Sequence, residues 1–452
     1  MKDFWRYVIQ GKEDLHGTAS FMGFCERRKL LSSKNRGVVI DGKRKLPLDL
    51  SNQGVLIVAP TGMGKSTTIV IPSVLNAHGQ SFVITDPSGE ILNLTRGYLE
   101  KELDYQIQVI NPTNLAESDT YNPLEAVGNF SDAQKVASIL IESAFPTASP
   151  TDSFWNESAI DLLSVLIRGV VNLDPEEQTL SYLLHLLEMF GTEQDAVNEI
   201  MVQVLDEKGY HQFRAFLSQE EKMMNSVLST AKTALRNLHD PTFSELTAST
   251  SFRFESLRET PTALFIQVPE TELHYYSFFL SILYTDLFKF IMQGDHSDKD
   301  LQPIFVLLDE GGHIKIPNLP TIATTIRKKK CSLSLIVQDL DQLHALYGRE
   351  ANAIIRGGMV NQLYFPGLDI QTCELLERTL GKETVSYSES GYGSSLKPAQ
   401  SRTAQMSRPL MSADEIRRMK GKALLLSSNK PPVLLKLKPW FKQKELVKRS
   451  KR

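Results

Sequence analysis

The chain has 452 residues, 41% of them hydrophobic and 23% charged, with a formal net charge of −3. The length exceeds one ordinary domain, and the composition excludes a collagen-like or intrinsically disordered chain. The net charge excludes a uniformly basic nucleic-acid-binding protein but not a local basic channel, and three cysteines without a CxxC pair indicate neither a disulfide framework nor a zinc site.

The first predicted elements alternate between strands and helices. An apolar run at residues 55–58 is followed by a glycine-containing turn and an apolar helix over residues 67–77. The order recurs with a strand at residues 81–86, a helix at 91–103 and a strand at 105–110. This alternation predicts a parallel sheet with helices on both faces.

Helical patterns replace the strand signals between residues 131 and 240 and predict an all-helical insertion. The nearest candidate for a membrane span, residues 154–173, lies within this insertion. Because Glu157, Asp161 and Arg168 interrupt the stretch, we expect a buried core helix and no membrane span.

Strand signals resume after the insertion and complete the sheet. Strands are predicted at residues 263–268, 304–310, 333–339 and 362–366. The aromatic residues at 275–290 could stack on nucleic-acid bases, but their helical spacing favours a place in the core.

Two late segments carry weak signals. The stretch between Ser386 and Ser407 is rich in Ser, Gly, Tyr and Gln, which predicts a mobile loop with little regular structure. Residues 430–452 hold nine Lys or Arg and one acidic residue, Glu445. For this basic tail we expect disorder, with binding to DNA, an anionic membrane or an acidic partner as alternatives.

A phosphate-binding loop, the P-loop, lies between the first predicted strand and helix in the sequence APTGMGKST. Gly62 and Gly64 let consecutive backbone N–H groups surround a phosphate at a helix N-terminus. Lys65 can reach the β- and γ-phosphates, and the Ser66 hydroxyl can complete the shell of a Mg²⁺ ion. Ala59 replaces the usual first glycine, a tolerated variant. The residues expected to bind ATP are Pro60, Thr61, Gly62, Met63, Gly64, Lys65, Ser66 and Thr67.

Two carboxylates, Asp309 and Glu310, end a predicted apolar strand at the sheet edge where ligands of α/β proteins bind. We expect Asp309 to hold Mg²⁺ and Glu310 to orient and deprotonate the attacking water. The alternative is a pair of solvated acids at a strand end.

Several other residues near this edge have open roles. Gln338 could sense the γ-phosphate or be a capping or surface residue. Arg327, in the run RKKK, could be an arginine finger on a neighbouring subunit's nucleotide or part of a solvated basic face. Asp86 and Glu90 could frame the site, but capping of the next helix is favoured. His313 lacks a partner at metal-ligand spacing and is expected beside the site or at the surface.

Together these segments resemble the coupling proteins of type IV secretion and conjugation systems, ATPases that bring DNA or protein substrates to the secretion channel. The likeness covers nearly the whole chain. Its segments are, in order, LHGTASF, APTGMGKST, DPSGE, YNPL, FWNESAIDLL, LLDE, IRKKK, LIVQDLDQLHALYG, LGKETV and RPLMSADEIRRM.

The resemblance implies an α/β fold, a RecA-like P-loop NTPase sheet with an inserted all-helical domain, assembled as a hexameric ring with ATP between subunits. Arg327 matches the family's finger position. The expected layout is an N-terminal segment (1–50), a nucleotide-binding domain in two parts (51–130 and 251–430), the all-helical insertion (131–250) and the basic tail (431–452).

The function implied is ATP-driven recruitment or translocation of DNA with attached protein. The implied partners are DNA, relaxase or effector proteins, secretion-channel ATPases and inner-membrane components. A nucleotide-gated docking receptor for secreted proteins and another hexameric DNA translocase of the same superfamily are the alternatives. Two features depart from the family: the chain begins without the usual pair of transmembrane helices, and GGHI at residues 311–314 replaces a Phe-containing turn. We therefore expect a cytoplasmic protein, with peripheral attachment at the inner face of the cell membrane as an alternative.

Overall fold

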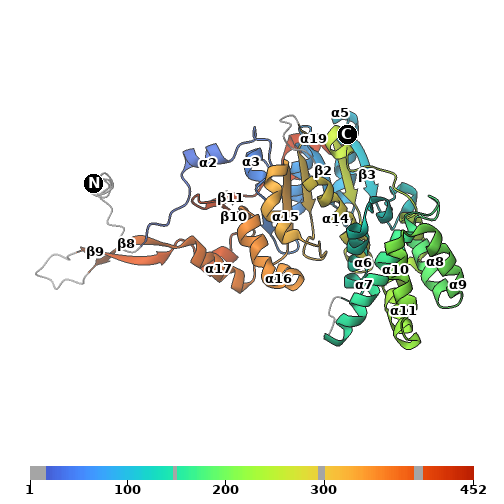
Figure 1. Cartoon of the computed structure of the whole chain (residues 1–452). Helices are drawn as coiled ribbons and strands as arrows, with labels where there is room; N and C mark the ends of the chain where they lie inside the picture. Colours follow the sequence, from blue (N-terminus) through green and yellow to red (C-terminus); the bar gives the residue numbers. More distant parts are fainter. Residues whose placement is uncertain (1–16, 146–149, 294–300, 391–400) are drawn as a thin grey trace, which may run out of the picture.

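A nine-stranded sheet runs through the middle of the molecule (Figure 1). The structure, a computed structural model, describes residues 17–145, 150–293, 301–390 and 401–452. The strand order is β11-β10-β7-β1-β6-β5-β2-β4-β3. The seven strands from β7 to β3 in this order are parallel, and β10 and β11 continue the sheet in antiparallel fashion. The strands are β1 (Val55–Val58), β2 (Ser81–Thr85), β3 (Gln106–Ile110), β4 (Thr262–Ile266), β5 (Ile304–Leu308), β6 (Cys331–Val337), β7 (Asn361–Tyr364), β10 (Lys422–Ser427) and β11 (Val433–Lys436).

Alternating side chains of the buried strands contribute to two separate hydrophobic cores, one on each face of the sheet. In β1, Val55 and Ile57 belong to one core and Leu56 and Val58 to the other. The predicted arrangement of helices on both faces is therefore confirmed. The first face is covered by α4 (Ile71–Leu75), α5 (Glu90–Leu103) and α19 (Lys444–Arg449), and the second by α14 (Ser277–Gln293), α15 (Leu319–Thr325), α16 (Asp341–Tyr347) and α17 (Ile370–Leu380).

The aromatic residues predicted to lie in the core do so. The segment 275–290 forms most of α14, and its aromatic residues Phe278, Phe279, Tyr284 and Phe288 are buried. Tyr284 is fully buried, and its hydroxyl lies 2.8 Å from the Thr85 hydroxyl of β2, so its single polar atom has a partner. This helix joins the sheet to the helices that follow β3.

Among the residues that the structure describes between β3 and β4 there are helices and loops but no strand, and we call the helices from Phe130 to Leu246 the insertion lobe. Within it, Ala159, Leu163, Leu166 and Val170 are buried at helical spacing, as predicted for a core helix. In the part of the chain that the structure describes, no helix combines the length and apolarity needed to cross a membrane. The lobe comprises α6 (Phe130–Ala144), α7 (Pro150–Val170), α8 (Leu180–Phe190), α9 (Gln194–Val204), α10 (Glu207–Leu217), α11 (Glu221–Leu235) and α12 (Pro241–Leu246).

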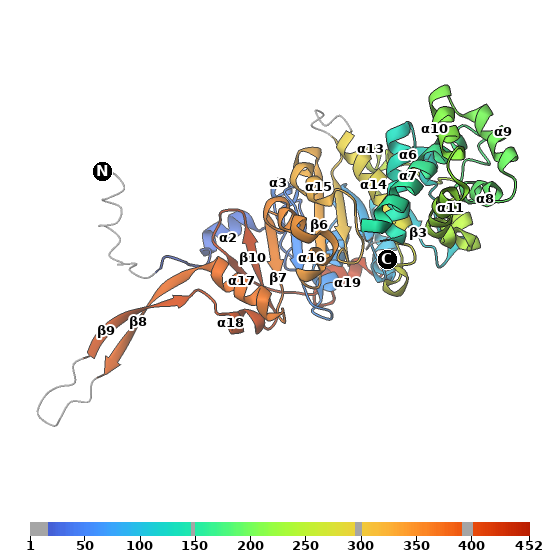
Figure 2. The same ribbon diagram turned by 60° about the horizontal axis from the view of Figure 1, so that its bottom comes forward.

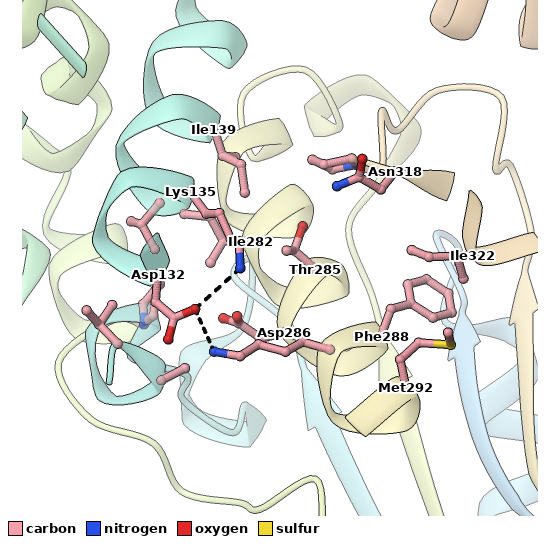
Figure 3. A pocket seen from close by; sticks show the side chains of 16 residues that line it. Asp132, Lys135, Ile139, Ile282, Thr285, Asp286, Phe288, Met292, Asn318 and Ile322 are labelled. Carbon is pink, nitrogen blue, oxygen red and sulfur yellow. Dashed lines mark ion pairs between the residues drawn. The ribbon is translucent and has the colours of Figure 1, made fainter. Parts of the chain in front are cut away.

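The lobe meets the sheet domain where α6 packs against α14 (Figure 3). Asp132 of α6 forms ion pairs with Lys289 of α14 at 2.9 Å and with Lys135 at 3.5 Å. Beside them, the Tyr121 hydroxyl donates to Asp286 at 2.6 Å, and burial raises the pKa of the Asp286 carboxyl to about 6. A cavity of about 200 Å³ separates this junction from the start of α15.

The prediction of a loop between Ser386 and Ser407 is wrong for most of this segment. Strands β8 (Lys382–Ser390) and β9 (Ser401–Pro409) pair in antiparallel register, and residues 391–400 of the prediction lie outside the described residues. In the sequence, Val385 and Tyr387 stand at alternate positions, as strand-forming residues do. The strand was missed because the residues around them are mostly polar and have low strand propensity. Figures 1 and 2 show this hairpin projecting from the end of the molecule opposite the insertion lobe.

The basic tail is ordered, so the prediction of disorder is also wrong. Leu446 of α19 is buried in the core of the first face. Arg449 donates hydrogen bonds to the Leu75 carbonyl at 2.7 Å and to Asn76 Oδ1 at 3.0 Å, at the end of α4. One arginine of the tail thus satisfies a carbonyl that a helix C-terminus leaves free.

Candidate nucleotide-binding site

The P-loop connects β1 to a helix that begins with a π-helical turn at Ser66–Val70 and continues as α4. The Ala59 N–H donates to the Val337 carbonyl at 2.9 Å, which ties the start of the loop to β6. Gly62 and Gly64 have φ angles of +78° and +83°. A Cβ on Gly62 would meet nothing within 4 Å, so this position needs glycine for its left-handed backbone and not for space.

The loop presents backbone donors at the helix N-terminus. Among the described residues, the N–H groups of Gly62, Gly64 and Lys65 donate to no other protein atom. The Thr67 hydroxyl donates to the Gly64 carbonyl at 3.1 Å and holds the end of the loop. Inward N–H groups at the positive end of a helix are suited to an anion such as a phosphate.

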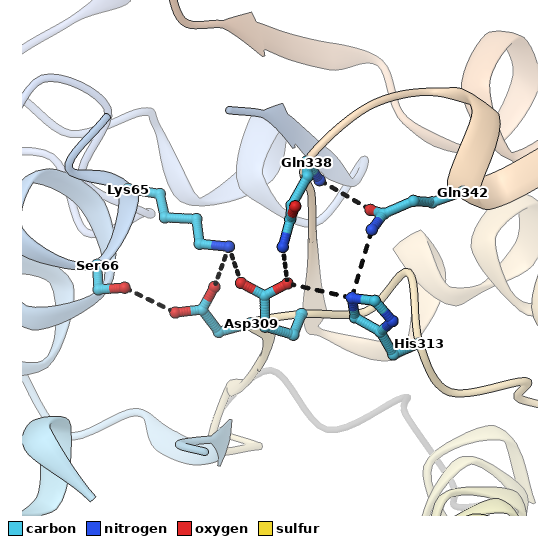
Figure 4. Close-up of polar contacts among 7 residues, drawn as sticks. Lys65, Ser66, Asp309, His313, Gln338 and Gln342 are labelled. Carbon is cyan, nitrogen blue, oxygen red and sulfur yellow. Dashed lines mark hydrogen bonds and ion pairs between the residues drawn. The ribbon is translucent and has the colours of Figure 1, made fainter. Parts of the chain in front are cut away.

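The acidic pair lies directly opposite this loop (Figure 4). Asp309 and Glu310 are buried at the end of β5. The Ser66 hydroxyl donates to Asp309 Oδ2 at 2.8 Å. The Lys65 ammonium lies 3.7 Å from Asp309 Oδ1 and forms an ion pair with Glu310 Oε1.

Asp309 has the surroundings of a cation ligand. Burial raises the pKa of its carboxyl, while the neighbouring Lys65 and Ser66 act in the opposite direction. Its Oδ1 atom is buried and accepts no hydrogen bond from a described residue. A serine hydroxyl beside a carboxylate oxygen is a donor set of the kind that Mg²⁺ prefers, so these residues fit the metal expected from the sequence.

Glu310 is held from two sides in a strained backbone conformation. Its φ of +61° lies in the left-handed region, which is uncommon for a residue with a side chain and is found at functional sites. The side-chain amide of Gln338, just beyond β6, donates to Glu310 Oε2 at 3.0 Å. The structure thus brings Lys65, Ser66 and Gln338 together around the acidic pair.

Arg327 is the one candidate catalytic residue that lies elsewhere. It is exposed in the turn Ile326–Lys329, before β6, whereas Gln338 follows the same strand. Seven strand residues at about 3.3 Å each separate these two positions by roughly 20 Å. Arg327 therefore cannot serve the nucleotide site of its own chain.

Asp86 does not reach the site either, because it accepts hydrogen bonds from the backbone N–H groups of Ile91 and Leu92. It caps α5, as favoured from the sequence.

Gln342 is the residue near the site that the sequence did not single out. Its Oε1 atom accepts a hydrogen bond from the Gln338 backbone N–H at 2.9 Å. Its Nε2 atom lies 3.4 Å from His313 Nε2, and the same ring nitrogen lies 3.7 Å from Glu310 Oε2. The spacing of four residues between Gln338 and Gln342, at the start of a helix, is the only sequence signal for this contact.

Known proteins resemble this chain along most of its length. The sequence profile of the family described as type IV secretory system conjugative DNA transfer matches residues 21–452. A conjugal transfer protein TraG of Escherichia coli is 25% identical over 400 residues, which cover 81% of this chain and 62% of TraG. Protein VirD4 of Agrobacterium fabrum is 22% identical over 453 residues, which cover 95% of this chain and 65% of VirD4. The chain thus spans less than two thirds of the length of either relative.

Solved structures show the same fold. The bacterial conjugative coupling protein TrwBdeltaN70, in an unbound form, superposes with a TM-score of 0.72 at 18% identity over 94% of each chain. TrwB in complex with ADP and Mg²⁺ gives a TM-score of 0.71 at 18% identity over 95% of each chain. The fold class predicted from the sequence is therefore confirmed.

Proposed function

The chain belongs to the type IV secretory system conjugative DNA transfer family, and on this premise we propose that it is an ATP-hydrolysing coupling protein. It would recruit or translocate DNA, with attached protein, to a type IV secretion channel. One observation carries the proposal of hydrolysis. Five side chains that follow three different strands lie in contact at one edge of the sheet: a P-loop lysine and serine, two carboxylates and a glutamine.

The contacts assign each side chain a role in hydrolysis. The P-loop N–H groups and Lys65 would hold the β- and γ-phosphates, and Ser66 with Asp309 would hold Mg²⁺. When bound, the ion neutralises charge on the phosphate oxygens. Glu310 would take the proton of the attacking water, and Gln338 would keep its carboxylate in place.

Nucleotide binding also changes the state of Glu310. Its Oε1 atom is paired with the Lys65 ammonium in the structure. When the lysine turns to the phosphates, it would release the Glu310 carboxylate from this ion pair. The same lysine would thus couple phosphate binding to release of the base.

The active assembly would be a homo-hexamer, in which Arg327 acts on the nucleotide of the neighbouring subunit. Its exposure and its distance from the site of its own chain support this role. Such a finger stabilises negative charge that develops on the transferred phosphoryl group. The assembly would work on the cytoplasmic side of the cell membrane, where ATP and DNA are found, and contact secretion-channel ATPases and inner-membrane components there.

The test is ATP hydrolysis by the purified chain, with and without DNA, at low and moderate salt. We expect DNA to stimulate hydrolysis and salt to weaken this effect, because phosphate contacts release counter-ions. Lys65→Ala should abolish hydrolysis while the variant still binds DNA. Hydrolysis that neither single- nor double-stranded DNA alters, at low salt and in the assembled state, would count against a DNA motor.

A docking receptor for relaxase or effector proteins is the second candidate. It is favoured by exposed apolar side chains on the insertion lobe, among them Phe154 and Val202. In that case nucleotide would only set the state of the ring. A Lys65→Ala chain that still delivers its substrate in a transfer assay favours the receptor, whereas one that binds substrate without delivering it favours the motor.

A further inference from the structure

The turn after the acidic pair is pressed against two other elements, and its two glycines make this possible. A Cβ on Gly311 would stand 2.4 Å from Leu335 Cδ1 of β6. A Cβ on Gly312 would stand 2.4 Å from Gln342 Oε1 of α16. Both distances are shorter than any van der Waals contact, so the Gln342 side chain lies directly on the backbone of the turn. The glycines thereby bring His313 next to Gln342.

The Gln342 amide has only one orientation that satisfies its neighbours. Its Oε1 atom accepts from the Gln338 N–H at 2.9 Å, and its own backbone N–H donates to Asp339 Oδ1 at 2.9 Å. The NH₂ group therefore points the other way, where His313 Nε2 lies at 3.4 Å. An amide NH₂ can only donate, so this ring nitrogen must accept and the imidazole proton must sit on Nδ1.

The accepting nitrogen of His313 faces a second acceptor. Glu310 Oε2 lies 3.7 Å away and already receives the Gln338 amide at 3.0 Å. Two acceptors cannot bond to each other, but one water molecule about 2.8 Å from each can donate a hydrogen to both. His313 also borders a surface hollow, lined in part by Glu142, His274 and Lys315, and 43% of its side chain is exposed to water.

We infer that His313 is a positioning residue, which with Glu310 holds the water that attacks the γ-phosphate. The inference rests on the proposed ATP hydrolysis. The water oxygen forms the new bond to the γ-phosphorus while the bond to the β–γ bridging oxygen breaks, which gives ADP and inorganic phosphate. One proton of the water passes to Glu310. The other O–H donates to His313 Nε2, and the imidazole takes up no proton.

The kinetic test separates positioning from nucleotide binding. We expect His313→Ala to lower kcat about tenfold, the effect of one good hydrogen bond, with KM for ATP changed less than about twofold. Gln342→Glu replaces the NH₂ donor by an acceptor, so it should force the proton onto His313 Nε2 and lower kcat by a similar factor. The double variant should be no slower than His313→Ala alone, because both changes remove the same contact. His211→Ala, an exposed histidine of α10, is the matched control and should leave kcat unchanged.

A spectroscopic test reads the tautomer without turnover. In nucleotide-free protein labelled with ¹⁵N-histidine, the signals missing from His313→Ala should show Nδ1 protonated and Nε2 unprotonated. An Nε2–H tautomer in the wild type overturns the inference. So does a His313→Ala chain as fast as an active wild type, and this result leaves the proposed function intact. A wild type without any ATP hydrolysis overturns the proposed function and, with it, this role of His313.

Discussion

Replacing Lys65 by Met should destabilise the protein even without nucleotide, because Lys65 is the cation that faces two buried carboxylates. At 3.7 Å, its attraction to Asp309 amounts to about 4 kcal/mol with an effective dielectric constant near 20. Breaking a buried ion pair from one side costs about 3–5 kcal/mol. Uptake of a proton by one carboxyl recovers about 1.4 kcal/mol for each unit by which its pKa exceeds the pH. We therefore expect a net loss of about 3 kcal/mol at pH 7.5.

The assay is thermal unfolding of the nucleotide-free protein at two pH values. An unfolding entropy of about 2.1 cal/mol/K per residue gives about 0.9 kcal/mol/K for this chain, so Tm should fall by about 3 °C. Burial raises the pKa of Asp309 in the folded state, so its contribution is favourable at low pH and is lost as pH rises above the unfolded pKa. Without Lys65 this loss grows, so the difference in Tm between Lys65→Met and wild type should be large at pH 7.5 and small at pH 5.

Two further variants check the reasoning. Lys315→Met removes one partner of an exposed ion pair with Glu142, at 3.5 Å, and should shift Tm by less than about 1 °C. The double variant Lys65→Met with Asp309→Asn removes one of the two uncompensated charges and should recover most of the lost stability. An unchanged Tm for Lys65→Met at pH 7.5, or the same loss at both pH values, would refute the argument.

Three further predictions concern other parts of the molecule. An equimolar mixture of Lys65→Ala and Arg327→Ala chains, each inactive alone, should regain about a quarter of wild-type hydrolysis, because in a randomly mixed ring one interface in four has both native residues. Asp286→Asn should raise the free energy of unfolding at pH 8 by about 3 kcal/mol and change it little at pH 4, since a folded pKa of about 6 makes wild-type stability fall as pH rises from about 4 to 6. Arg449→Ala should cost about 2 kcal/mol in chemical denaturation, because it loses a charged hydrogen bond to the Leu75 carbonyl.

Each of these predictions has a clear contrary result. A mixture as inactive as its two components would exclude Arg327 from a shared site. An Asp286→Asn chain whose advantage is the same at both pH values would mean that charge is not the cause. Arg449→Ala with native stability would show that the docked tail contributes nothing to folding.

Most buried strands could be predicted from the sequence, because a strand covered on both faces is a short apolar run bounded by turn residues. β1 and β5 are examples. β8 could not be predicted, since most of its residues are polar and its pairing with β9 is what makes it a strand. The order of the tail also depends on contacts with remote parts of the chain. Its many charges predicted a disordered segment in solvent, but Leu446 packs into the core and Arg449 donates to the Leu75 carbonyl of α4.

The site was predictable as far as its members follow the ends of parallel strands, which meet at one edge of a sheet. That rule gathers Lys65, Asp309 and Gln338 without any coordinates. It does not reveal that Lys65 pairs with Glu310, nor that Gln342 lies on a glycine of the next turn. Both facts depend on how side chains pack between elements that are remote in the sequence.

The position of the insertion lobe has a consequence for how such proteins diversify. β3 and β4 are parallel neighbours, and any parallel pair requires a crossover connection, which a single helix can provide. The lobe is thus an enlarged crossover at one end of the sheet order, and the P-loop, the acidic pair and Gln338 all follow other strands. A gene that exchanged residues 130–246 for another helical crossover, while keeping the face of α6 that contacts α14, would leave the site residues untouched. Selection could therefore alter the lobe without first disturbing the residues around the P-loop.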